Sequence, residues 1–150
     1  MQTIRCVFLA LALLLVSSCV PLFDGDHWIE VARTPSPDGR LDAILVEDGG
    51  DATTGVFHDV FVVPHGAPVP HSRQEIVAVF EWAFRNDSAL GVNPHWRSRR
   101  VLALEYARAS HQNIWRATVP FEDECVTVVL ARGVVDPTAP AGRMVRTRSK

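Results

Sequence analysis

Several features that mark common protein classes are missing from this chain of 150 residues. Its longest unbroken apolar run, residues 6–16, is too short to span a bilayer as a mature helix. The net charge of −2 at pH 7 gives no case for binding nucleic acid. Neither a G-x-S-x-G nucleophile elbow nor a G-x-x-x-x-G-K-[ST] phosphate loop is present. Lys150 is the only lysine, which we interpret as a base-composition bias of the genome.

The N-terminal segment has the pattern of a secretory signal peptide. Arg5 supplies a positive charge, the apolar run follows, and small residues come next. The four residues Val16-Ser17-Ser18-Cys19 resemble the lipobox of bacterial lipoproteins. This resemblance implies a diacylglyceryl group on the sulfur of Cys19, cleavage before Cys19, and acylation of the new amino group. An ordinary secretory signal, or an uncleaved anchor, is the alternative.

Lipidation at Cys19 would make the membrane a partner of the mature chain. Two or three acyl chains are enough for stable anchoring, because each buried CH₂ contributes about 0.8 kcal/mol. Val20 follows the cysteine where an Asp would favour the inner membrane, so we expect the outer membrane, facing the periplasm, if the source is Gram-negative. We therefore expect a signal peptide over 1–18 and a lipidated tether over 19–26.

Cysteine is scarce, and its placement excludes an intramolecular disulfide in the mature chain. There are three cysteines. Cys6 would leave with the signal peptide and Cys19 would be lipidated, so Cys125 would be alone. An exported domain of this kind must rely on its hydrophobic core.

The rest of the chain predicts an all-β domain over residues 27–133, followed by a basic, flexible tail over 134–150. Short segments with alternating or β-branched apolar residues are separated by turn signals such as "PSPDG". The predicted strands cover residues 27–34, 40–47, 56–64, 75–80, 90–96, 100–107, 113–119 and 124–133. Residues 73–85 also fit a helix face, and Pro94 predicts an edge strand or a bulge. We expect a small, mostly antiparallel β-sandwich or open barrel of about seven short strands.

Four segments in order are similar to a group of small exported bacterial proteins of unknown function. They are "SPDGRLDAILVE", "GGDATTGVFHDVFVV", "NPHWRSRRVLALEY" and "CVTVVLA", and the resemblance covers about residues 35–131. Asp51 stands where the pattern of the group has glycine. The resemblance implies an all-β fold and export, and it implies no activity.

The acidic stretch "EDGGDATTG", residues 47–55, is the first candidate site. Glu47, Asp48 and Asp51 offer oxygen ligands of the kind that Ca²⁺ prefers, but they lack the order of ligands of an EF-hand. A solvated hairpin loop, in which glycines and threonines satisfy an irregular backbone, explains the same residues. We favour the loop, assign no metal, cofactor or catalytic residue, and keep calcium binding as a hypothesis.

The histidines and Cys125 are further candidates. His58, His65 and His71 show no spacing typical of a zinc site, and His58 and Asp59 are adjacent on a predicted strand and so face opposite ways. Exposed histidines are the favoured interpretation. Cys125 lies in a Val-rich strand directly after acidic residues, which disfavour a thiolate, so we expect a buried structural cysteine.

Four tryptophans lie in or beside predicted strands, and packing explains them: Trp28, Trp82, Trp96 and Trp115. Exposure of two of them on one sheet face would indicate a partner or glycan site. The C-terminal "GRMVRTRSK" is a solvated tail or a contact to anionic lipid headgroups.

These observations predict a lipid-anchored protein of the cell envelope that acts as a binding or structural accessory module, with an envelope protein as partner. We do not expect an enzyme. One alternative is an immunity or inhibitor lipoprotein against a toxin or lysozyme-like enzyme, with Glu47, Asp48 and Asp51 entering a basic cleft. The other alternative is an envelope hydrolase.

Overall fold

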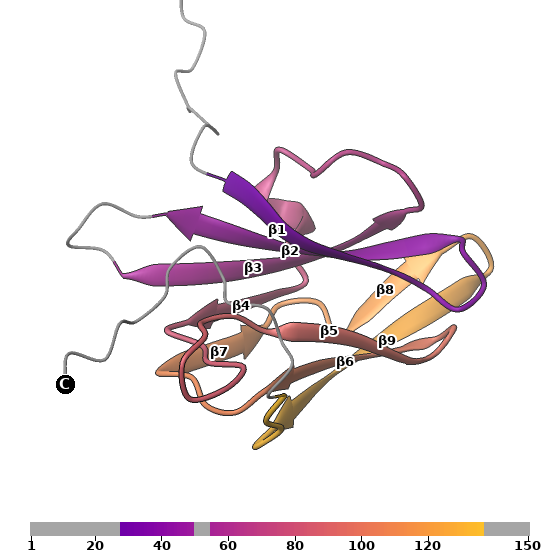
Figure 1. Ribbon diagram of the computed structural model, residues 1–150. Helices are drawn as coiled ribbons and strands as arrows, with labels where there is room; N and C mark the ends of the chain where they lie inside the picture. The colour runs from indigo at the N-terminus through magenta and orange to yellow at the C-terminus, as the bar shows by residue number, and fades with distance from the viewer. Residues whose placement is uncertain (1–27, 50–54, 137–150) are drawn as a thin grey trace, which may run out of the picture.

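Two β-sheets packed face to face confirm the predicted all-β fold (Figure 1). The computed structural model describes residues 28–49 and 55–136, and these residues form nine strands and one 3₁₀ turn rather than about seven strands. The elements are β1 (Trp28–Pro35), β2 (Leu41–Gly49), β3 (Val56–Pro64), η1 (Arg73–Glu75), β4 (Ala78–Glu81), β5 (Asn93–Ser98), β6 (Val101–Tyr106), β7 (His111–Ile114), β8 (Thr118–Phe121) and β9 (Glu124–Arg132).

The five-stranded sheet has the order β1-β2-β3-β4-β7 and is antiparallel throughout. The four-stranded sheet has the order β5-β6-β9-β8, in which β6 and β9 are parallel and the other pairs antiparallel. The two sheets do not close on each other, so the described part of the chain is sandwich-like and not a barrel. Pro94 lies in the edge strand β5, as predicted, because an edge strand does not need every backbone N–H for its ladder.

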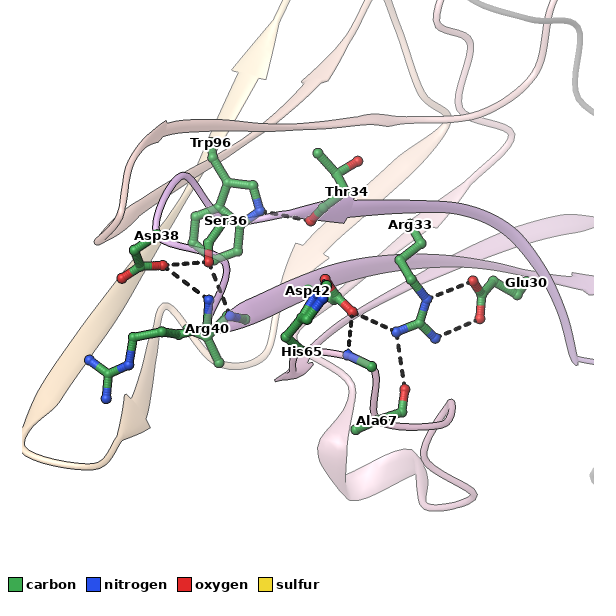
Figure 2. Close-up of polar contacts among 12 residues, drawn as sticks. Glu30, Arg33, Thr34, Ser36, Asp38, Arg40, Asp42, His65, Ala67 and Trp96 are labelled. Atoms are coloured by element: carbon green, nitrogen blue, oxygen red, sulfur yellow. Dashed lines mark hydrogen bonds and ion pairs between the residues drawn. The ribbon is translucent and has the colours of Figure 1, made fainter.

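Local turn chemistry places the β1–β2 hairpin. The Ser36 hydroxyl donates to the Asp38 carboxylate at 2.7 Å and accepts from the Leu41 amide at 3.0 Å. Gly39 has a φ of +69°, which glycine adopts without strain. Figure 2 shows this turn beside Trp96, whose indole N–H donates to the Thr34 carbonyl at 3.0 Å. That bond joins β5 of one sheet to β1 of the other.

Two of the predicted strands are wrong in detail. The strand expected over residues 75–80 begins at Ala78, and the residues before it form η1. The single strand expected over residues 113–119 is two strands, β7 and β8, in different sheets. Trp115 lies between them, and its amide and that of Arg116 both donate to the Val77 carbonyl, which ends the pairing of β7.

The central strands β2 and β3 of the five-stranded sheet are buried on both faces. The inner face of the sheet packs on the second sheet and forms the main core, with Leu41, Ala43, Leu45, Val60, Phe80, Leu102, Leu104 and Tyr106 among its members. Its outer face carries a second apolar cluster: Ile44, Val46, Phe61, Val63 and Ile76. The segment between β3 and β4 covers this face, on the side away from β5, β6 and β9 (Figure 1). The sheet therefore has buried positions for polar side chains on either side.

Candidate functional site

A pocket of about 400 Å³ lies on the outer face of the five-stranded sheet. It is lined by Asp48, Phe57, Asp59, Arg73, Ile76, Val79 and Trp115. Three neighbouring strands, η1 and the residue that follows β7 all contribute. The walls are mainly apolar and aromatic, and three charged side chains face the same space. This composition is typical of ligand pockets, which combine an apolar lining with a few placed polar groups.

The strand register brings the two carboxylates of the pocket together. Asp48 on β2 lies opposite Phe57 on β3, and Asp59 lies opposite Val46 on β2 and Val79 on β4. Directly opposite residues share a face of the sheet, and so do residues two apart on one strand. Asp48 and Asp59 are therefore diagonal neighbours on the outer face. The two carboxylates come from separate strands, so sequence spacing alone does not reveal their proximity.

Asp59 is the most unusual group of the pocket. The residue is 4 % exposed, and no hydrogen bond or ion pair within the described part of the chain includes its carboxyl group. Burial, which is the largest effect, and the nearby Asp48 carboxylate raise the pKa of Asp59, the Arg73 guanidinium opposes them, and the net result is a pKa of about 6. Asp59 therefore changes between acid and carboxylate close to neutral pH, at a position that faces a pocket.

Arg73 reaches the pocket from η1. Its guanidinium lies 3.4 Å from the Asp48 carboxylate, and its side chain is 74 % exposed, so this ion pair is weak. The base of the turn is better fixed, because Ser72 caps η1 by accepting from the Gln74 amide, and the next residue, Ile76, is buried in the outer cluster. The pocket thus has one largely exposed cation, which projects from a capped turn that is packed on the sheet.

Trp115 forms an exposed aromatic wall of the pocket. It is 51 % exposed, whereas Trp96 is buried and Trp28 packs on Phe61 with ring centroids 5.3 Å apart. The predicted packing role is therefore confirmed for Trp28 and Trp96 and wrong for Trp115. Its position after the end of β7 explains the exposure, since no further strand pairs beyond that edge. An exposed tryptophan beside a pocket is a typical recognition element.

A second polar group on the same face stabilises the fold (Figure 2). The side chain of Asp42 on β2 is 1 % exposed and accepts hydrogen bonds from Arg33, from His65 Nδ1 and from the Gly66 amide, at 2.8, 2.8 and 2.9 Å. Burial alone would raise the pKa of Asp42, but the bonds from Gly66, His65 and Arg33 together lower it to about 2. This carboxylate is fully compensated and fixes the segment after β3 to the sheet.

Arg33 extends the Asp42 cluster to the surface. It makes two bonds to the Glu30 carboxylate, at 2.8 and 2.9 Å, and one to the Ala67 carbonyl, at 3.0 Å. The hydrogen bonds to Glu30 and Asp42 raise the pKa of Arg33 above its ordinary value. The cluster holds the β3–β4 segment against the sheet through these hydrogen bonds.

A third polar group lies on the inner face. His58 is 2 % exposed, and its Nδ1 has no hydrogen-bond partner in the part of the chain that the structure describes. Burial and, to a smaller extent, the charge of Arg85 together lower the pKa of His58 to about 4. Arg85 is itself buried and donates to the Val92 carbonyl at 2.7 Å, with Gly91 packed against its guanidinium. This group lies within the sandwich, away from the pocket.

The predictions for individual residues have mixed outcomes. The side chains of His58 and Asp59 lie on opposite faces, as expected, but His58 is buried rather than exposed, because both faces of β3 are covered. His65 and His71 are exposed. Cys125 is exposed, so the prediction of a buried cysteine is wrong.

The register of β9 explains the exposure of Cys125. Cys125 faces away from the core, whereas its neighbour Val126 and Val128 face into it. Successive side chains of β9 therefore point alternately into the core and to the surface, which the valine-rich composition of the segment does not indicate. Cys125 pairs with Pro120 of the edge strand β8.

Two of the three candidate calcium ligands of the acidic stretch, Glu47 and Asp48, do not share one site. Glu47 and Asp48 are consecutive residues of β2, opposite His58 and Phe57, so their side chains lie on opposite faces of the sheet and do not converge. Asp51 lies outside the described residues. Among residues 28–49 and 55–136, no three His, Cys, Asp or Glu side chains are grouped so that they could hold a metal ion.

The lipid attachment site at Cys19, with the rest of residues 1–27, also lies outside the described residues and stays a prediction. In the described ranges, no helix has the length and apolar character needed to cross a membrane. Comparisons with protein-family models, with curated proteins and with solved structures give no match.

One signal for the pocket was present in the sequence. Asp59 interrupts "VFHDVFVVP", a strand that is otherwise β-branched, aromatic or apolar except for His58. A carboxylate in such a run needs either a solvent-facing position or a buried role. The sequence pattern indicated Asp59 only as a possible zinc ligand, and neither Arg73 nor Trp115 carries a sequence signal for the pocket.

Proposed function

We propose that this chain is a lipid-anchored binding module of the bacterial cell envelope and that the pocket around Asp59 is its binding site. The observation that carries the proposal is a buried carboxyl group without a hydrogen-bond partner among the described residues, which faces a pocket beside the exposed Trp115. The lipobox-like sequence at residues 16–19 supports the anchor.

The frame of the pocket supports binding rather than a purely structural role. Asp48, Phe57, Asp59 and Val79 lie on paired strands, so their backbone positions are fixed before any ligand arrives. A preformed site loses less conformational entropy on binding than a site built on loops. A volume of about 400 Å³ suits a small molecule or one side chain of a larger partner.

The proposed anchor would keep this site close to a membrane. A tether over residues 19–26 spans at most about 28 Å when fully extended. The first strand of the sheet, β1, begins at Trp28. A ligand held by the outer face of that sheet would therefore also be held near the envelope surface.

Cross-linking in intact cells tests the proposal. The full chain and a Trp115→Ser variant are cross-linked in the envelope, and the captured molecules are compared. We expect Trp115→Ser to lose partners that the unaltered chain captures. Val135→Ser is the matched control, because Val135 is a similarly exposed apolar residue outside the pocket. An identical set of captured molecules for all three chains would contradict a binding role for the pocket.

The two carboxylates that line the pocket, Asp48 and Asp59, favour a second candidate function, that of an envelope hydrolase. Asp59 has a pKa raised to about 6 and could donate a proton, while Asp48 lies next to it as a second carboxylate. Two carboxyl groups whose environments differ are a common arrangement for general acid catalysis. Turnover of purified cell-wall polymer by the full chain, abolished in Asp59→Asn, would support this candidate. Absence of turnover at pH 5 to 7 would leave only the binding role.

A further inference from the structure

We propose that the pocket takes a guanidinium group carried on an apolar stem, with the Asp59 carboxylate as its counter-ion. The inference rests on the proposed function, since it assumes that the pocket is the binding site, and it adds the chemical class of the ligand.

The contrast between two buried carboxylates on the same face is the first step. Asp42 accepts hydrogen bonds from Arg33, His65 and Gly66. Asp59 is buried to a similar extent and accepts none within the described residues. A buried ion without a partner is costly, and a ligand cation would supply the missing charge and hydrogen bonds. The pocket thus lacks a hydrogen-bond donor and a paired positive charge for Asp59 among the described residues.

The charges around Asp59 favour a cation over an anion. Asp48 and Arg73 both line the pocket, and their opposite charges lie 3.4 Å apart and neutralise each other. The negative charge of an ionised Asp59 therefore has no counter-charge in the pocket lining. The register places Glu81 opposite Phe57, and His111 opposite Glu81, further along the same face. With Asp59 ionised, these carboxylates outnumber the cations. An anionic ligand would therefore meet repulsion.

The shape and lining of the pocket favour a guanidinium group. Trp115 and Phe57 offer aromatic rings, on which a planar guanidinium stacks better than a compact ammonium. Ile76 and Val79 supply apolar contact for a stem. The Arg73 guanidinium lies 3.4 Å from the Asp48 carboxylate, so a guanidinium group fits beside one carboxylate of the pocket. Because its side chain is largely exposed, Arg73 can move aside.

Protonation of Asp59 competes with the ligand and gives the inference a pH signature. The pKa of Asp59 is about 6, so the carboxylate dominates at pH 7 and the neutral acid at pH 5. Affinity for a cation should fall about tenfold from pH 7 to pH 5, which is the loss of ionised Asp59 over that interval. Because His111 lies on the same face, His111→Gln is measured alongside, and the pH dependence should persist in it.

Calorimetric titration of the full chain in detergent tests the inference. The probes are n-butylguanidinium and n-butylurea, which have the same shape and differ in charge. At pH 7 we expect n-butylguanidinium to bind at least tenfold more tightly. Asp59→Asn should lose that preference and the pH dependence. Asp87→Asn makes the same chemical change at an exposed residue outside the pocket and should behave as the unaltered chain.

Arg73→Gln is a second variant that does not disturb a buried group. Removing the internal cation should strengthen the binding of n-butylguanidinium severalfold. A titration with acetyl-Gly-Arg-Gly-amide separates the two sources of the group: tighter binding than the small probe indicates an arginine side chain of a peptide, and weaker binding indicates a free small cation.

Three results would overturn the inference: equal affinity for the two butyl probes, no binding of either, or an affinity that Asp59→Asn leaves unchanged. None of these would contradict the proposed function, because loss of cross-linked partners in Trp115→Ser is measured independently of ligand charge. A negative cross-linking result together with charge-selective titration would reject the envelope partner and keep the cation site.

Discussion

His58 and Asp59 are consecutive residues of β3, and their side chains are buried on opposite faces of the five-stranded sheet. Burial lowers the pKa of His58 to about 4 and raises the pKa of Asp59 to about 6. Both changes favour the neutral form of the group. One strand therefore contributes two opposite dependences of stability on pH, and each can be measured separately by substitution.

The first prediction concerns Asp59. Its pKa in the folded chain is raised above the ordinary value of 3.8, so its contribution to stability is present below pH 3.8 and lost as pH rises through about 6. At pH 7 the ionised group should destabilise the fold on the order of 3 kcal/mol. Asp59→Asn should therefore raise the urea midpoint at pH 7 and leave it nearly unchanged at pH 4. A midpoint difference independent of pH would contradict the burial of this carboxylate.

The second prediction concerns His58. Its pKa in the folded chain is lowered from 6.5, so its contribution is present above pH 6.5 and lost as pH falls toward 4. Over that interval, protonation should cost the unaltered chain on the order of 3 kcal/mol. His58→Gln should be less stable at pH 7 but should lose less stability on acidification. Urea unfolding at pH 7 and 4.5 compares the two chains, and parallel losses would exclude His58 as the titrating group.

The sequence predicted those parts of the fold that depend on local signals. The turn at residues 35–39 and the strand Val56–Pro64 follow from proline, glycine and β-branched residues, and both are observed. The split between β7 and β8 was not predicted, because residues 113–119 contain no proline or glycine turn signal and the pairing ends where the Trp115 and Arg116 amides donate to the Val77 carbonyl. Tertiary contacts decided that boundary.

The candidate site was beyond sequence reasoning for a similar reason. Asp48 and Asp59 become neighbours through the β2–β3 register, and Arg73 and Trp115 reach them from segments that have no strand pairing at those positions. The outer layer itself depends on the segment between β3 and β4, which the sequence predicted as a loop followed by a strand and which instead covers the sheet. The sequence did single out Asp59, but the pairing partners that give it a pocket are set by the fold.

The third prediction concerns the cluster around Asp42. Asp42→Asn should destabilise the fold at pH 7 by about 2 kcal/mol, because it weakens three hydrogen bonds and leaves Arg33 without its buried partner. The pKa of Asp42 is lowered to about 2, so its contribution is present above pH 3.8 and lost as pH falls through 2. Glu30→Gln is the control: this partner of Arg33 is exposed, and its loss should cost less than 1 kcal/mol. Equal effects of the two variants would contradict the anchoring role.

The fourth prediction concerns lipidation. The sequence Val16-Ser17-Ser18-Cys19 predicts that labelled palmitate is incorporated into the chain in cells and that Cys19→Ala abolishes the label. Cys125→Ala is the matched control, because Cys125 is an exposed thiol that the lipobox resemblance does not involve. Label that persists in Cys19→Ala would reject the lipobox, and label that disappears in Cys125→Ala would place the acyl group on the wrong cysteine.

The fifth prediction compares two glycines with positive φ. Gly91 has a φ of +131°, and an added Cβ would lie 2.7 Å from Nε of the buried Arg85 side chain. Gly39 has a φ of +69°, and no atom lies within 4 Å of the position of its Cβ. Gly39→Ala should therefore cost about 1 kcal/mol from backbone strain alone. Gly91→Ala should cost several times more, since Arg85 cannot move without losing its bond to the Val92 carbonyl inside the sandwich. Thermal unfolding of the two variants at pH 7 checks this order, and similar melting temperatures would mean that the Arg85 side chain relaxes freely.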